Sequence, residues 1–262
     1  MMTSIWAGIS RMVERFPTIP GGIIVIYFGF CACALAADLP PRPFSSFDTA
    51  KEIARDTIFA DRPTDYYCGC TYTPTGKSGG KIDASQCGYT PRKNPTRGKI
   101  LEWEHVVPAW FFGHNRACWK AGHDRCVTSA GKKYAGRECC AKVDTKFKRI
   151  EADLHNLVPS VGELNGDRSN LPYGLVDGEP RLYGACNFEI GGNPRVAEPP
   201  ENVRGDVARI WFYMSETYGI RVSPSMTEMF RQWSEADPVD AFERTRNERV
   251  FETQGNRNHF VE

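Results

Sequence analysis

Residues 103–113 read WEHVVPAWFFG, and residues 153–170 read DLHNLVPSVGELNGDRSN. In the first stretch, Glu104 and His105 follow a short run at 99–103 whose β-branched and aromatic residues predict a strand. A glutamate beside a histidine is usually a hydrogen-bonded core or surface pair, so this spacing alone is a weak indication of catalysis. Neighbours on a regular strand point to opposite faces, so we expect the backbone to bend here if both side chains serve one site.

The second stretch overlaps a stripe of apolar residues with helical spacing. The stripe predicts one helix over 145–157 that stops before Pro159. At about 100° per residue, Asn156 points away from the centre of the stripe, so we expect it to face a cleft. Beyond the helix, we expect Asn165 and Arg168 to belong to a hydrogen-bonded loop beside that cleft.

The remaining patterns predict mainly helices. Apolar residues recur at helical spacing over 47–58, 207–218 and 226–233, and Gly219 ends the second of these helices. Dense glycine, proline and asparagine between residues 66 and 105 favour short strands, one of them over 66–72. The hydrophobic fraction of 41% and the charged fraction of 25% are those of an ordinary globular chain. We therefore predict one mostly helical α+β domain.

The N-terminal segment differs from the rest of the chain. Two arginines precede an apolar run at 23–36, which is too short for a bilayer span of about 20 residues. We predict a signal peptide over 1–36, cleaved after Ala36, and a mature domain over 37–262 in the periplasm or outside the cell. The alternatives are an uncleaved anchor and a lipid anchor on a cysteine of the run.

The cysteines agree with export. Cys31 and Cys33 lie in the predicted signal peptide, and eight cysteines remain, an even number that favours four disulfides in an oxidising compartment. The sequence leaves the pairing open. The alternative is a zinc site formed by His123 and three cysteines, although adjacent cysteines fit one tetrahedral metal poorly. The eight candidates are Cys68, Cys70, Cys87, Cys118, Cys126, Cys139, Cys140 and Cys186.

The charge of the chain gives no global attraction to nucleic acid. Removing residues 1–36 takes away two arginines and one glutamate, so the formal net charge falls from +1 to zero. Lysine and arginine gather locally at 92–99, 132–149 and 244–257. Such clusters are usually solvated faces, and alone they identify no partner.

Together the two opening stretches resemble the bacterial endonuclease I family of periplasmic and extracellular nucleases. The resemblance covers nearly all of the mature chain, because shorter motifs continue it in order. They are YYCGC at 66–70, QCGY at 86–89, GREC at 136–139, AEPP at 197–200, ARIWFYM at 208–214 and QGNRN at 254–258.

The resemblance implies a ββα-metal nuclease core, in which two strands and a helix hold one divalent ion. It puts the general base at His105, the protein metal ligands at Glu104 and Asn156, and the active-site arginine at Arg137. An insertion between Cys118 and Cys139 makes Arg125 a competitor for the arginine position. We also expect Asn165, Arg168 and Arg125 to contact nucleic acid.

These residue types suit phosphodiester hydrolysis. A hard cation with few protein oxygen ligands favours Mg²⁺, with Mn²⁺ or Ca²⁺ as substitutes, and neutral imidazole can take a proton from water. A planar guanidinium binds phosphate oxygens in pairs. The predicted enzyme is a monomer that cuts DNA, with RNA as a further substrate, and its mature form uses no membrane. His114 and His155 are alternative ligands.

Two other functions remain open. A phosphodiesterase for small exported substrates would need a closed pocket. A disulfide-rich binding module without activity would be expected to have lost Glu104 or His105, and both are present.

Overall fold

The computed structural model describes residues 44, 46–178 and 180–262. The predicted signal peptide, its cleavage after Ala36, and Cys31 and Cys33 lie outside the described residues. Within the described part of the chain, no helix is both long enough and apolar enough to cross a membrane.

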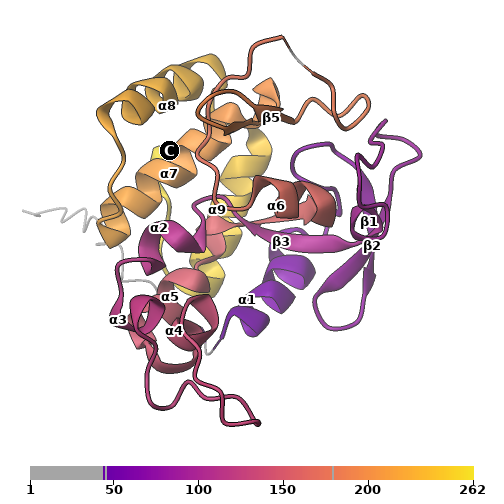
Figure 1. Ribbon diagram of the computed structural model, residues 1–262. Coiled ribbons are helices and arrows are strands. Elements are labelled where there is room, and N and C mark those ends of the chain that lie inside the picture. The colour runs from indigo at the N-terminus through magenta and orange to yellow at the C-terminus, as the bar shows by residue number, and fades with distance from the viewer. Residues whose placement is uncertain (1–43, 45, 179) are drawn as a thin grey trace, which may run out of the picture. The chain divides into compact units, whose positions relative to one another are not determined.

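The centre of the domain is a hairpin followed directly by a helix. Strands β3 (Leu101–His105) and β4 (Leu157–Val161) pair antiparallel, with His105 opposite Leu157 and Leu101 opposite Val161. Helix α6 (Gly162–Arg168) starts where β4 ends and packs against both strands. Figure 1 shows α6 on one side of β3 and α1 (Phe47–Ile53) on the other. Because both faces are covered, every residue of β4 is buried.

The segment between β3 and β4 folds into a group of short helices. Asp144 ends one helix and caps the next, since its side chain accepts a hydrogen bond from the backbone N–H of Phe147. This cap joins α4 and α5, which pack against each other. The group consists of α2 (Ala109–Gly113), α3 (Ala117–Lys120), α4 (Arg137–Val143) and α5 (Thr145–Glu151).

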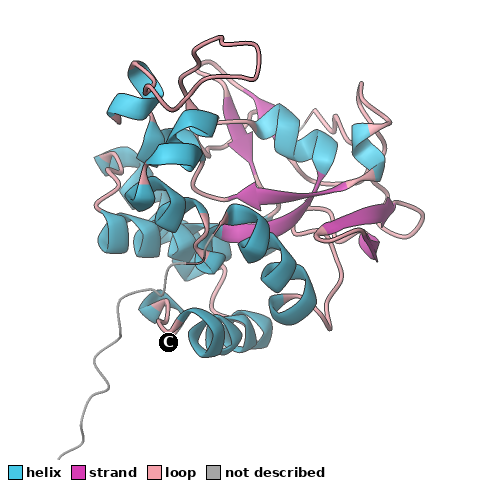
Figure 2. Cartoon of the chain, turned by 90° about the horizontal axis from the view of Figure 1, so that it is seen from below, coloured by secondary structure: helices cyan, strands magenta, loops and turns pink. Residues whose placement is uncertain are grey.

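Three longer helices complete the helical part of the domain, which Figure 2 shows beside the short sheets. Helices α7 (Arg204–Tyr218) and α8 (Pro224–Ala236) confirm the predictions at 207–218 and 226–233, and Gly219 ends α7 in the left-handed conformation. Helix α9 (Ala241–Gln254) was missed because it has no regular apolar stripe. Its N-terminus still carries a signal, since Asp240 and Glu243 form a reciprocal capping box.

Small elements surround this frame. Helix α1 continues as a π-helical turn at Ala54–Ile58, so the predicted helix over 47–58 is present. The remaining strands are β1 (Thr71–Thr75) paired with β2 (Gly79–Asp83), and β5 (Glu189–Gly191) paired with β6 (Val196–Glu198). Four 3-10 turns lie at Arg97–Lys99, Leu154–Asn156, Glu201–Val203 and His259–Val261.

Two predicted elements were misplaced. The strand expected over 66–72 begins only at Thr71, because Gly69 takes a positive φ and turns the chain between two disulfide-bonded cysteines. The single helix expected over 145–157 ends at Glu151, and its last part is a 3-10 turn that leads into β4. The apolar stripe is real, but its later members belong to the hairpin core.

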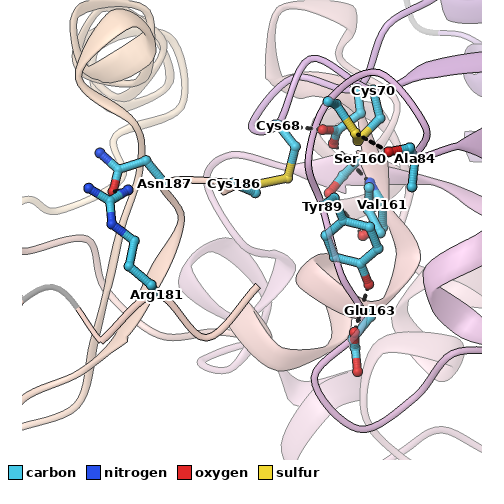
Figure 3. Close-up of a disulfide and its surroundings, with 12 residues drawn as sticks. Cys68, Cys70, Ala84, Tyr89, Ser160, Val161, Glu163, Arg181, Cys186 and Asn187 are labelled. Carbon is cyan, nitrogen blue, oxygen red and sulfur yellow. Dashed lines mark hydrogen bonds between the residues drawn. A yellow bond between two sulfur atoms is a disulfide. The ribbon is translucent and has the colours of Figure 1, made fainter. Parts of the chain in front are cut away.

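All eight cysteines of the described residues are paired, which confirms a disulfide-bonded α+β domain. Figure 3 shows Cys68 joined to Cys186, near the contact of Tyr89 with Glu163 on α6. The pairs are Cys68–Cys186, Cys70–Cys87, Cys118–Cys140 and Cys126–Cys139. This pairing excludes the zinc alternative, because no cysteine beside His123 retains a free thiolate.

Candidate active site

His105 lies at the end of β3, where the ring is enclosed by α1, α2 and α5. Its Nε2 is 2.8 Å from the backbone carbonyl oxygen of Glu151. A carbonyl oxygen can only accept, so Nε2 carries the ring hydrogen and Nδ1 keeps its lone pair. Burial, reinforced by the positive charge of Arg137, lowers the pKa of His105 to about 3. The ring is therefore a neutral imidazole with Nδ1 as its basic atom.

Arg137, the first residue of α4, faces that basic atom. Its Nη2 lies 3.5 Å from His105 Nδ1, and its Nε donates to Glu151 Oε1 at 2.7 Å. The guanidinium also stands over the ring of Phe47, 5.3 Å from the centroid. Because 43% of the Arg137 side chain remains exposed, it can still meet a phosphate. The geometry therefore favours Arg137 over Arg125, which lies exposed in the insertion.

Two residues of this arrangement were not anticipated. Phe47 packs on His105 with ring centroids 4.8 Å apart, and so keeps one face of the imidazole dry. Glu151 holds His105 through its backbone and Arg137 through its carboxylate. Glu151 fell in the middle of the helix predicted over 145–157, and no sequence pattern indicated its partners.

Glu104 points to the other side of β3, toward α6. Its Oε1 lies 3.0 Å from Nη1 of Arg168, which is fully buried, and Tyr67 donates to the same oxygen at 3.4 Å. Burial raises the pKa of Glu104 to about 7, although Arg168 and Tyr67 favour the carboxylate. In the described part of the chain, Oε2 of Glu104 receives no hydrogen bond.

The expected bend between Glu104 and His105 is not seen. Backbone pairing with β4 continues through His105, so the two side chains leave the strand on opposite faces. Arg168 lies behind this strand end, where it donates to the carbonyl oxygens of His105 and Val106 at 2.9 and 2.6 Å. Its buried position corrects the expectation that it contacts nucleic acid.

Asn165 lies on α6, one turn before Arg168, and faces β3. Its Nδ2 donates to Glu102 Oε2 at 2.8 Å, and Glu102 is also paired with Arg97. This bond fixes the orientation of the amide, and within the described residues Oδ1 of Asn165 has no hydrogen-bond partner. Asn165 and Arg168 lie three residues apart on the same face of α6, and Arg168 contacts Glu104. Asn165 and Glu104 therefore both lie where α6 packs against β3.

Asn156, the expected metal ligand, is placed differently. It lies on a 3-10 turn and is fully buried. Its Oδ1 accepts from the backbone N–H of Val107 at 2.7 Å, and its Nδ2 donates to the Val107 carbonyl oxygen at 3.0 Å. The Asn156 amide is therefore hydrogen-bonded to the backbone just after β3. The helix of the ββα core is α6, and not the helix expected over 145–157.

The alternative histidine ligands do not face this site. His155 is buried against Tyr213, with Nε2 3.1 Å from the carbonyl oxygen of Asn256. His114 stacks on Trp110 outside the hairpin. A cluster of Asp65, Cys68 and Cys70 is also unsuited to a metal, because both sulfurs are in disulfides and the carboxylate accepts backbone N–H groups.

Arg137 lines several surface grooves, and two of them also contain Asn165. One has a volume of about 290 Å³ and the other about 520 Å³, and both are lined by Glu102, Arg137 and Asn165. The smaller groove extends to Phe47, and the larger one extends to Trp110. The exposed arginine and the oriented amide therefore share one surface that a substrate can reach.

Comparison with known proteins identifies the family of this chain. Residues 48–262 match the family model described as Endonuclease I. The chain is 43% identical to Endonuclease-1 of Buchnera aphidicola subsp. Acyrthosiphon pisum over 78% of this chain and 76% of that protein. It is 39% identical to an extracellular deoxyribonuclease of Aeromonas hydrophila over 78% and 83% of the two chains. A periplasmic deoxyribonuclease of Aeromonas hydrophila is 38% identical over 82% and 85%. The chain belongs to the endonuclease I family.

Proposed function

We propose that this protein is an exported endonuclease that hydrolyses DNA without reading its sequence and uses Mg²⁺ as its cofactor. The observation that carries the proposal is the pairing of a neutral, oriented His105 with the exposed Arg137. The relatives named extracellular and periplasmic deoxyribonucleases support DNA as the substrate and export as the location.

His105 acts as the general base. Since Nε2–H is committed to the Glu151 carbonyl, Nδ1 takes the proton from the attacking water. The low pKa of His105 keeps this lone pair available at neutral pH. Attack at phosphorus with departure of the 3′ oxygen leaves 5′-phosphate ends. This route does not need a 2′-hydroxyl, so RNA is a second expected substrate.

Arg137 supports the phosphate during attack. Its Nε is held by Glu151 and its Nη2 lies 3.5 Å from His105 Nδ1, which leaves Nη1 as the donor toward phosphate oxygens. Paired N–H donors from a planar guanidinium match the negative charge that develops on those oxygens. A phosphodiesterase for small substrates would enclose its arginine in a pocket, and the exposure of the Arg137 side chain argues against that alternative.

The oxygen atoms at the contact of β3 and α6 fit a hard divalent cation. Glu104 Oε2 and Asn165 Oδ1 would hold Mg²⁺, and Glu102 keeps the Asn165 amide oriented. When bound, the ion would act from the face of β3 opposite His105, and it would neutralise charge on the phosphate and on the departing oxygen. The revised ligand pair replaces Asn156 by Asn165 and keeps Glu104.

The test is plasmid nicking by the mature, disulfide-bonded protein with Mg²⁺, with Mn²⁺ or Ca²⁺, and with chelator. His105→Ala should fold normally and lose about 10²- to 10⁴-fold in rate, the usual contribution of a general base. His259→Gln, an exposed histidine paired with Glu216, is the matched control and should keep full activity. Near-normal nicking by folded His105→Ala, or in chelator, would reject the proposal.

The remaining parts of the proposal concern the state of the enzyme. We propose a monomer without a membrane anchor, released by cleavage after Ala36. N-terminal sequencing and light scattering of the exported protein test both points. A mature protein that begins before residue 31, or that carries lipid, would contradict this form of export.

A further inference from the structure

A second groove lies next to the active site and has no part in the chemistry proposed above. It has a volume of about 510 Å³ and is bounded by α2, the start of α5 and the segment that follows α7. Figure 1 shows these three segments on the same side of the domain. Trp110 lines both this groove and the larger groove at Arg137, so one side chain borders the two.

The charge of this groove is positive. Among the described residues that line it there are two arginines, a lysine and a histidine, and neither aspartate nor glutamate. Arg116 is neutralised by Asp144 at 2.8 Å. Lys146 and Arg221 are exposed, and within the described chain neither is paired with a carboxylate. Their charges are therefore available to an anionic ligand.

The wall shared with the active site is aromatic. Trp110 is 39% exposed, and its indole is stacked on His114 with ring centroids 3.8 Å apart and planes 6° apart. His114 Nδ1 lies 2.6 Å from the backbone carbonyl oxygen of Trp110, so Nδ1 carries hydrogen and Nε2 is the ring nitrogen left for a ligand. An exposed, rigid aromatic pair beside unpaired cations is the combination that binds nucleic acid strands.

Another cavity provides the contrast. It has a volume of about 410 Å³, and it is lined by Asp65, Asp206, Asp237 and Asp240 with Arg62 as its only lysine or arginine. A polyanion would be repelled there and attracted to the groove at Trp110. The position of positive charge thus distinguishes the two cavities, even though the net charge of the mature chain is near zero.

We propose that the groove formed by Trp110, His114, Lys146 and Arg221 binds the DNA strand that flanks the cleaved bond. Lys146 and Arg221 contact its phosphates, and the Trp110–His114 pair contacts its sugar or base faces. This inference rests on the proposed nuclease function and adds the path of the substrate away from Arg137.

The experiment measures DNA binding separately from cleavage. Binding of a fluorescein-labelled duplex is followed by anisotropy across salt concentrations, with chelator present and in the His105→Ala background. The variant is the pair Lys146→Ala and Arg221→Ala. Each lost phosphate contact should lower the slope of log affinity against log salt by about 0.9, and so by nearly two for the pair.

The matched control removes the same charge elsewhere. Lys81 on β2 and Arg244 on α9 are exposed and line none of the grooves described above. The pair Lys81→Ala and Arg244→Ala should leave the slope unchanged. Trp110→Ala should weaken binding about fivefold or more with an unchanged slope, and Trp110→Phe should restore part of the affinity.

The outcomes separate the two proposals. If the wild type binds and cuts DNA but the Lys146 and Arg221 variant keeps the wild-type slope, the groove is not the strand site and the nuclease function stands. An equal loss in the Lys81 and Arg244 control would also reject the groove, because it would show only a general effect of charge. If the wild type neither cuts nor binds DNA, both proposals fail.

Discussion

Glu151 holds two functional side chains with two different atoms. Its backbone oxygen accepts from His105, and its carboxylate, buried in the core, accepts from Arg137. Burial raises the pKa of Glu151, and Arg137 opposes that rise. A single residue thus sets the tautomer of His105 and the direction of Arg137.

This division gives a prediction for Glu151→Gln. The backbone bond to His105 remains, but the ion pair with Arg137 is lost, so kcat should fall about tenfold while the pH profile set by His105 is retained. Steady-state kinetics at several pH values check this. A variant with unchanged kcat would show that the ion pair does not position Arg137.

Asn156 and Asn165 allow a direct comparison of two amides. Asn156→Ala removes both partners of Val107 in the core, and each unpaired backbone group costs about 1 to 3 kcal/mol, so the free energy of unfolding should fall markedly. Asn165→Ala, at a half-buried position, should melt like the wild type and bind Mn²⁺ about tenfold more weakly. Calorimetry of unfolding and of Mn²⁺ binding separates these effects. The reverse pattern would restore Asn156 as the ligand.

At the level of elements, α4 is the most strongly anchored helix of the site. Cys139 and Cys140 follow Arg137 by two and three residues, and they form disulfides to Cys126 and Cys118. One bridge ties α4 to α3, and the other ties it to the insertion. The helix that presents Arg137 is therefore fixed from two directions.

The two bridges should differ in their effect. Replacing Cys126 and Cys139 by serine frees the insertion, so stability should fall by about 3 kcal/mol while activity is largely kept. Replacing Cys118 and Cys140 releases α4 from α3, and activity should fall as well as stability. Thermal unfolding and nicking assays of both double variants test this. Equal loss of activity in both would show that the insertion itself supports the site.

At the scale of the whole molecule, the net charge is small, but the charged side chains are distributed unevenly. Residues 37–262 carry no formal net charge, yet cations line the groove at Trp110 and aspartates line a separate cavity. A protein of this kind contacts few phosphates, so electrostatics favour a local docking surface over long-range attraction.

Cleavage should therefore be broadly distributed. Arg137, which reaches the surface at the site, is suited to phosphate oxygens, and phosphate contacts carry no sequence information. Cut-site maps on unrelated duplexes, repeated across salt concentrations at fixed Mg²⁺, should show scattered cuts and a shallow decline with salt. A shared recognition sequence at the cuts would contradict this reading.

The sequence by itself determined the family, the even set of disulfide cysteines and the apolar helices at 207–218 and 226–233. It also predicted His105 and Arg137 as site residues, and the fold brings these two side chains together. These follow from local spacing and from long ordered motifs. The tertiary structure alone decided the pairing of the cysteines, the partners of Glu151 and the different hydrogen-bond partners of Asn156 and Asn165. The physical reason is that an amide has the same local sequence signature whether its atoms bind backbone in the core or face a cleft. Only the fold shows that the amide of Asn156 is hydrogen-bonded to the backbone of Val107, whereas Glu102 orients the amide of Asn165.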